Sequence, residues 1–147
     1  MGLGVQADLA RLSALEYLHR FIARYAFLEQ GSPGTLVTGN VPVGIARGDI
    51  VSDGLMLIGD AARQADPLTG GGIANAMIAA QLAAEVAAEA LEQGNMSRDL
   101  LKEYQRRWTD GRGRKTARNY RLKSRFSAAE RTSHGFLRAF AVATGGK

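Results

Sequence analysis

The stretch that most constrains the fold of this chain is Asp53–Asn75, DGLMLIGDAARQADPLTGGGIAN. It opens with an Asp-Gly pair typical of a hairpin turn, and four apolar residues follow, Leu55–Ile58, the length of a buried strand. Gly59 ends this run and lets another surface approach the backbone. Asp60 then stands at the carboxyl end of the strand, where α/β folds bind ligands. We therefore predict a strand, a turn, a loop and a helix around a ligand site at Asp60.

A run of three glycines, Gly70, Gly71 and Gly72, precedes the long apolar segment Ile73–Leu91. Its many alanines favour a helix. The amino end of a helix presents free backbone N–H groups and the positive end of the helix dipole. Gly72 and Ile73 are therefore candidates to donate to an electron-rich atom. The alternative is a glycine-rich helix start that needs only close packing.

These residues resemble two motifs of flavoproteins. Asp53-Gly54 together with Gly59–Ala62 resembles the second FAD-binding motif of the aromatic-hydroxylase type, and Pro67–Gly72 resembles the PxxGxG motif of geranylgeranyl reductases. The combined block resembles the archaeal enzymes that saturate the geranylgeranyl chains of membrane lipids. The resemblance implies FAD as cofactor, a role in isoprenoid phospholipid biosynthesis, and a cytoplasmic location with peripheral contact at the membrane as a further option.

The resemblance also implies which residues hold the flavin. Asp60 would bind the ribityl chain, and an ordinary turn aspartate is the alternative. Gly72 and Ile73 would lie near the flavin N1/O2 edge, where the helix dipole would stabilise the reduced ring by ~1–2 kcal/mol. The predicted FAD-binding residues are Gly59, Asp60, Ala61, Pro67, Gly70, Gly71, Gly72 and Ile73. Asp66 and Arg63 are assigned to turn geometry and surface solvation, and no catalytic residue or metal site is assigned.

The implied function is an FAD-dependent reductase acting on the C=C bonds of geranylgeranyl chains of archaeal membrane-lipid precursors. A bacterial or plant relative acting on chlorophyll-type prenyl groups is an alternative. Its partners would be a prenylated lipid substrate and an external electron donor, either NAD(P)H or a ferredoxin-type protein. An FAD-dependent monooxygenase is an alternative, and oxygen consumption coupled to hydroxylation would identify it. A basic helical module that binds lipid or RNA is a further alternative, with nucleic acid disfavoured as a partner, and salt-sensitive nucleic-acid binding would reveal it.

The chain has neither the GxGxxG dinucleotide fingerprint nor the YxWxFP motif that the resemblance places upstream. We therefore expect the carboxyl-terminal third to two-fifths of a reductase, inactive alone. The expected fold is helix-rich α+β, a partial FAD/NAD(P)-binding fold of the aromatic-hydroxylase type that lacks the amino-terminal Rossmann half. We assign residues 1–52 to the end of a substrate-binding domain, 53–95 to the flavin-binding strand–loop–helix, and 96–147 to a basic helical region.

Charge is divided unevenly along the chain. Residues 1–97 carry a net charge of −5 and residues 98–147 a net charge of +10. The basic half could face anionic lipid headgroups, a phosphate-bearing substrate or nucleic acid, and the simplest alternative is a solvated helical surface or pairing with a missing acidic part. The absence of cysteine excludes disulfides and thiolate chemistry, and allows a cytosolic setting.

Several further elements follow from local patterns. Ser13–Glu16 reads as a capping box, which predicts a helix from Leu9 or Ser13 to Leu28. The aromatic residues of this helix would line a prenyl cavity or, more commonly, form core: Tyr17, Phe21, Tyr25 and Phe27. Thr35–Thr38 predicts a short strand.

Three more helices are expected towards the carboxyl end. Ser97 predicts the start of a helix whose apolar face includes Trp108, and further helices are expected over about 115–129 and 135–143. Within Ile73–Leu91, polar residues recur every fourth position and mark a solvent-facing stripe rather than a membrane span: Gln81, Glu85 and Glu89.

Overall fold

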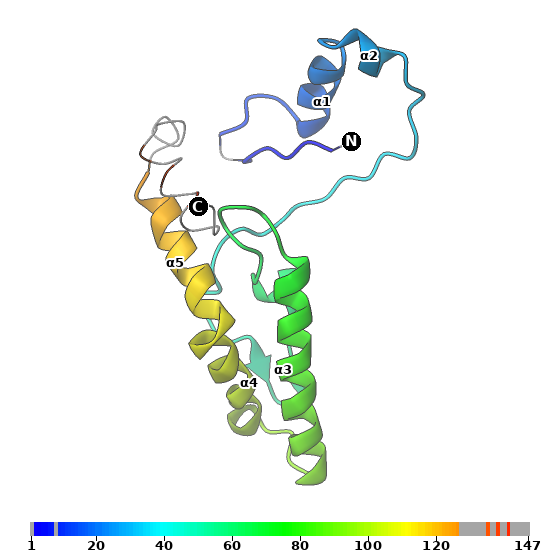
Figure 1. Ribbon diagram of the computed structural model, residues 1–147. Helices are drawn as coiled ribbons and strands as arrows, with labels where there is room; N and C mark the ends of the chain where they lie inside the picture. The colour runs from blue at the N-terminus through cyan, green and yellow to red at the C-terminus, as the bar shows by residue number, and fades with distance from the viewer. Residues whose placement is uncertain (1, 8, 127–134, 136–137, 139–140, 142–147) are drawn as a thin grey trace. The chain divides into compact units, whose positions relative to one another are not determined.

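The computed structural model describes residues 2–7, 9–126, 135, 138 and 141 (Figure 1). The chain forms two compact units, Met1–Gly39 and Asn40–Lys147. Its described part is helix-rich with one two-stranded sheet, as the predicted α+β class requires. Within these described residues no helix is long and apolar enough to cross a membrane.

The first unit contains two short helices, α1 (Ala14–Ile22) and α2 (Ala26–Glu29). The predicted capping box is present, because the Glu16 N–H donates to Ser13 Oγ at 3.2 Å and the Ser13 N–H donates to Glu16 Oε2 at 3.4 Å. The prediction of one continuous helix to Leu28 is wrong. The backbone of Tyr25 is extended, at φ −129° and ψ 102°, and this interrupts the helical turn.

The aromatic residues of this unit do not form a core. The break at Tyr25 places its ring 5.1 Å from that of Phe21 and 6.0 Å from that of Phe27, and all three side chains remain exposed. The predicted strand Thr35–Thr38 is also wrong, since the backbone there is irregular and Val37 is 84% exposed. Strand-forming residues need a bonded partner strand, and the described sheet contains only β1 and β2 of the second unit.

The second unit begins with a hairpin of β1 (Val51–Ser52) and β2 (Leu55–Met56), paired antiparallel. The predicted Asp-Gly turn is confirmed, and Gly54 takes φ +65°, which glycine adopts without strain. The predicted buried strand Leu55–Ile58 is shorter and more open than expected. Leu55 and Ile58 are exposed because, among the described residues, only β1 pairs with this strand.

Three helices complete this unit: α3 (Ile73–Glu92), α4 (Arg98–Asp110) and α5 (Arg112–Ser124). The core lies between α3, α4 and the hairpin, which lie side by side in Figure 1. Small buried residues of α3 let the large side chains of α4 approach closely. This core consists of Ile50, Val51, Ala62, Ala79, Ala83, Val86, Ala90, Leu101, Tyr104 and Trp108.

The carboxyl-terminal helices differ in detail from prediction. The Ser97 side chain makes no capping bond, and the Arg98 N–H instead donates to Asp53 Oδ1 at 2.6 Å. The last described helix starts at Arg112, earlier than predicted, because Gly111 leaves helical geometry (φ −94°, ψ −112°) and so separates α4 from α5. The helix expected over 135–143 lies mostly outside the described residues.

The polar stripe of α3 is confirmed, and its partner is on α4. Gln81, Glu85 and Glu89 are exposed. The guanidinium of Arg107 lies 3.6 Å from Glu85 and 3.0 Å from Glu89. This side of α3 therefore faces solvent and the guanidinium of Arg107 on α4.

Candidate functional site

The candidate site starts where β2 leads into the short 3-10 helix η1 (Gly59–Ala62). Gly59 is buried with φ +62°, and a Cβ built on it would lie 3.3 Å from the Cβ of Ala76 on α3. Its N–H donates to Gln64 Oε1 at 2.7 Å. The close approach of another surface at Gly59 is therefore present, and that surface is the first part of α3.

Asp60 lies against the start of α3. Gly72 is the residue before the first turn of this helix, and a Cβ built on it would lie 3.2 Å from Asp60 Oδ1 and 3.7 Å from the Cβ of Ala65. Asp60 is itself exposed. An acceptor carboxylate and the free N–H groups of a helix start thus lie close together. A side chain at position 72 would crowd this carboxylate, and glycine does not.

The loop between η1 and α3 is closed by its own hydrogen bonds. Asp66 Oδ1 accepts from the N–H groups of Leu68 at 2.9 Å and Thr69 at 3.1 Å, which confirms its assignment to turn geometry. The backbone of Asp66 also bonds in both directions, to Gly70 and Gly71 at 2.8 Å each. This arrangement holds the glycines in place beside the helix start.

The remaining predicted residues are spread around this loop. Pro67 is buried, Ala61 and Gly71 are exposed, and Gly70 takes φ +71°. Ile73 is 82% exposed, so the first turn of α3 is open on that side.

A buried polar network that the sequence did not reveal supports the site from behind. Gln64 Nε2 donates to the Tyr104 hydroxyl at 2.9 Å, and that hydroxyl donates to the Leu57 carbonyl at 2.8 Å. Asn75 Nδ2 donates to the Gln64 carbonyl at 2.7 Å, and Arg112 Nε donates to Asn75 Oδ1 at 2.8 Å. Burial raises the pKa of the Tyr104 phenol, which therefore stays protonated at neutral pH. The network joins the turn after β2, the first turn of α3, and both later helices.

A hollow of about 440 Å³ opens beside the glycine loop. We call it the polar hollow because many of its lining side chains are polar or charged: Asp66, Thr69, Asn75, Arg112, Lys115 and Asn119. Its size is within the range of small-molecule sites. One wall is the loop and the first turn of α3, and the other wall is α5. The residues of α5 that line it were not predicted as site residues: Arg112, Lys115 and Asn119. In the sequence their distinguishing feature is a position within a cation-rich segment, and such a segment is typical of a solvated surface.

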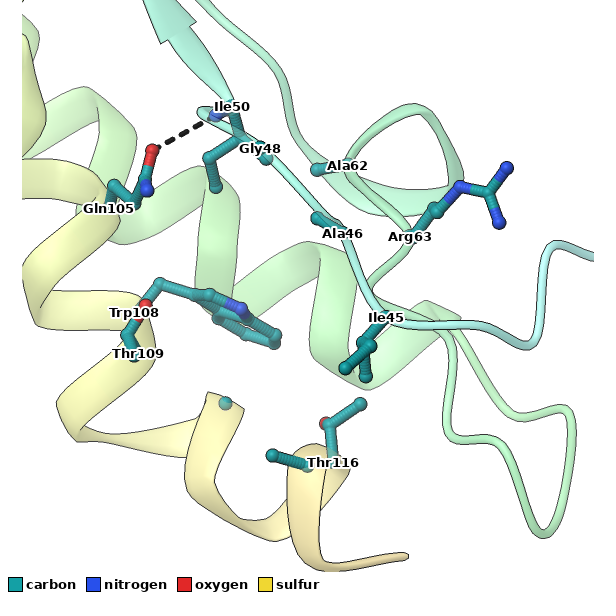
Figure 2. A pocket seen from close by; sticks show the side chains of 12 residues that line it. Ile45, Ala46, Gly48, Ile50, Ala62, Arg63, Gln105, Trp108, Thr109 and Thr116 are labelled. Carbon is teal, nitrogen blue, oxygen red and sulfur yellow. Dashed lines mark hydrogen bonds between the residues drawn. The ribbon is translucent and has the colours of Figure 1, made fainter. Parts of the chain in front are cut away.

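A second, smaller hollow of about 200 Å³ lies elsewhere on this unit (Figure 2). Trp108 and Ile45 project into it, and at its edge the Ile50 N–H donates to Gln105 Oε1 at 2.9 Å. It shares no lining residue with the polar hollow, and fewer of its lining side chains are charged. The loop and helix start that the sequence selected therefore belong to the larger, polar hollow. Among the described residues no cluster of metal-ligating side chains is found.

Comparisons with known proteins agree with the resemblance. The chain is 40% identical over 129 residues to the digeranylgeranylglycerophospholipid reductase of Methanosphaerula palustris, covering 86% of this chain and 32% of that protein. It is 42% identical over 117 residues to the protein of the same name from Thermoplasma volcanium, covering 80% and 30%. The chain thus spans about a third of the length of these curated relatives. No family model matches it.

A solved structure is also similar. It is described as a geranylgeranyl bacteriochlorophyll reductase-like protein from Thermoplasma acidophilum, with a TM-score of 0.70 and 40% sequence identity. The match covers 79% of this chain and 29% of that one. The resemblance to geranylgeranyl reductases inferred from the motif block is therefore confirmed in sequence and in structure.

Proposed function

We propose that this chain carries the flavin-binding strand, turn and helix of an FAD-dependent geranylgeranyl reductase. The substrate class is the geranylgeranyl chains of archaeal membrane-lipid precursors, as the names of its relatives suggest. One observation carries the proposal: Asp60 Oδ1 lies 3.2 Å from where a Cβ on Gly72 would be, so carboxylate and helix start face one ligand.

The residues present fit a flavin. Asp60 offers an exposed acceptor for the ribityl hydroxyls, as acidic residues do for sugar hydroxyls in dinucleotide folds. The first-turn amides of α3, from Gly72 and Ile73, have no carbonyl one turn earlier in their own helix and can donate to an electron-rich ring edge. Gly59, Ala61, Pro67, Gly70 and Gly71 complete the proposed set by fixing the backbone around these two groups.

When bound, FAD supplies hydride transfer to a carbon–carbon double bond. The part played by this chain is to hold and orient the ring through Asp60 and the start of α3. The positive end of α3 favours negative charge at the ring edge by ~1 kcal/mol. A prenylated lipid and an external electron donor, NAD(P)H or a ferredoxin-type protein, are the partners we propose.

The wider architecture belongs to the same proposal. We assign residues 53–147 to part of a fold of the aromatic-hydroxylase type. Residues 1–52 then form the end of a substrate-binding domain, 53–95 the flavin-binding segment and 96–147 a helical region. The protein would act in the cytoplasm, at the membrane surface where its lipid substrate is reached.

A chimera tests the proposed function. The chain replaces its matching segment in the Methanosphaerula palustris relative, and bound FAD and the saturation of geranylgeranyl lipids are measured by absorbance and by mass spectrometry. We expect both to be retained. Asp60→Ala should lower FAD affinity by about tenfold or more, the value of one hydrogen bond to a charged group.

Glu92→Ala is the matched control, because Glu92 is an exposed carboxylate at the other end of α3. It should leave FAD binding and lipid saturation unchanged. A chimera that retains folded structure but binds no FAD contradicts the proposal. Oxygen uptake coupled to hydroxylation of the lipid would contradict the reductase assignment while leaving the flavin site intact.

A further inference from the structure

The polar hollow has a second wall that the proposed function does not use. Arg112, Lys115 and Asn119 lie on one side of α5 and line the hollow opposite Gly72 and Ile73. Their spacing of three and four residues places them on one face of the helix. Part of the cation-rich segment is therefore turned towards the glycine loop.

The charge of this hollow is positive. Asp66 is its lining carboxylate, and both of its oxygens already accept hydrogen bonds, Oδ1 from the loop and Oδ2 from Asn119 Nδ2 at 2.6 Å. Arg112 is held by its bond to Asn75. Among the described residues no carboxylate pairs with Lys115, which is half-buried. Two cations and the positive end of α3 thus face a space whose one carboxylate is engaged.

Asn119 adds an unpaired acceptor. It is 1% exposed, and within the described part of the chain its Oδ1 is buried without a hydrogen-bond partner. A flipped amide would place its oxygen against Asp66 Oδ2, so the orientation is fixed by the 2.6 Å bond. A buried acceptor without a partner costs free energy. Less than 1 Å² of this oxygen is accessible, so a ligand N–H recovers that free energy once the Asn119 side chain shifts towards the hollow.

We propose that this wall of α5 binds the pyrimidine edge of the flavin, with Asn119 accepting from the ring N–H and Lys115 and Arg112 facing the flanking carbonyl groups. This proposal rests on the proposed function and extends the site to a third element. The imide edge of a flavin consists of a carbonyl oxygen, an N–H and a second carbonyl oxygen. Two cations can bind the carbonyl oxygens while the amide oxygen of Asn119 accepts from the N–H between them. Lys115 then favours the ring when it carries negative charge.

A phosphate group is the main competing ligand. It would satisfy the two cations and the helix start, as anions commonly do. A fully ionised phosphate has no N–H or O–H to offer Asn119 Oδ1, however, and would leave that acceptor unpaired beside negative charge. The combination of cations with an unpaired acceptor therefore favours the imide.

The full 147-residue chain can be tested directly by following backbone amide resonances in NMR titrations with FMN and with AMP, which carries a phosphate but no isoalloxazine. We expect FMN to shift the amides of Gly71–Asn75 and of residues near Lys115, and AMP to leave them in place. Lys115→Gln should weaken binding of anaerobically reduced FMN about tenfold, and that of oxidised FMN less. Lys102→Gln, the same change at an exposed lysine of α4, should alter neither.

The outcomes separate this inference from the proposed function. If FMN shifts Gly59 and Asp60 but not the residues around Lys115, the α5 wall is not part of the site and the proposed function stands. Equal shifts with AMP identify a phosphate site and overturn the inference. Absence of FMN shifts at both Asp60 and Lys115 contradicts both proposals. Equal losses for oxidised and reduced FMN in Lys115→Gln would show that Lys115 does not respond to the charge of the ring.

Discussion

At the scale of single residues, the Asp60 carboxylate lies where a side chain at position 72 would be, at the start of α3. The backbone at Gly72 has a negative φ (φ −119°, ψ −27°), so alanine there avoids the strain of the left-handed region. The new Cβ would lie 3.2 Å from Asp60 Oδ1, so the carboxylate must move. Gly72→Ala should therefore change ligand binding more than folding.

We expect Gly72→Ala to lower FMN affinity about tenfold while the free energy of unfolding changes by less than about 1 kcal/mol. NMR titration and urea unfolding measure the two quantities. Gly34→Ala is the control, because a Cβ at Gly34 meets open space. Wild-type affinity in Gly72→Ala would show that the carboxylate does not need its present position.

A second residue-scale prediction concerns the hydroxyl of Tyr104. This side chain is fully buried and its hydroxyl links Gln64 to the Leu57 carbonyl. Tyr104→Phe leaves the buried Gln64 Nε2 and the half-buried Leu57 carbonyl without this partner, so the free energy of unfolding should fall by about 1–3 kcal/mol. Urea unfolding measures it, with Tyr17→Phe on α1 as a half-buried control expected to change stability by less than about 0.5 kcal/mol. Equal effects of the two changes would mean that the network adds no stability.

At the scale of elements, the alanine-rich face of α3 decides how closely α4 packs. Ala79 is completely buried in the core that also contains Leu101 and Tyr104. Ala79→Leu should destabilise the fold by about 1–3 kcal/mol because the added atoms have no space. Thermal unfolding measures the loss, and Ala84→Leu, on the exposed side of α3, should be nearly neutral. A stabilised Ala79→Leu would indicate unfilled space between the helices.

The ion pairs of α4 give a pH-dependent prediction. Hydrogen bonds from Arg106 and then Arg107 lower the pKa of Glu103 from 4.5 to about 2. A lowered carboxylate pKa means that its stabilising contribution is present above pH 4.5 and is lost as the pH falls to about 2. Glu103→Gln should therefore have a lower Tm than wild type at pH 7 and an equal one near pH 2. The difference should be small and should shrink in high salt, because the pair is exposed to solvent.

Elements with a complete local signal could be predicted from the sequence. The Asp53-Gly54 turn, the capping box at Ser13 and the alanine-rich α3 each carry their own physical cause in neighbouring residues. The strand predicted at Thr35–Thr38 failed because strand formers need a bonded partner strand, and the described sheet does not include this segment. The break at Tyr25 likewise comes from geometry that helical spacing does not report.

The sequence selected only one side of the candidate site. Asp60, Gly59 and Gly72 lie within one stretch of sequence, so a local motif selected them together. Lys115 and Asn119 line the hollow on α5, which begins at Arg112 after the break in helical geometry at Gly111. Nothing local to a cation-rich helix distinguishes the face that turns inward from the faces that are solvated.

At the scale of the whole molecule, the chain spans about a third of its relatives and its polar hollow is open. Binding must then be achieved with few contacts, and the cost of immobilising a ligand is not fully offset. We expect FMN to bind the 147-residue chain with a Kd of about 1 mM. In the chimera the affinity should be at least ~100-fold higher, as measured by fluorescence quenching. Equal affinities would mean that the second unit already provides the complete flavin site.

The length of α3 is constrained by contacts near its two ends. At one end Ala76 lies against Gly59, and just beyond the other the Met96 carbonyl accepts a hydrogen bond from the Gly54 N–H at 2.8 Å. The hairpin and the turn that follows it therefore contact the chain near both ends of α3, which is 20 residues long. Removing one residue from the middle of α3 would rotate its first turn by about 100° relative to its last turn. Side chains along α3 can be exchanged, but its residue count cannot change without carrying Gly72 away from Asp60.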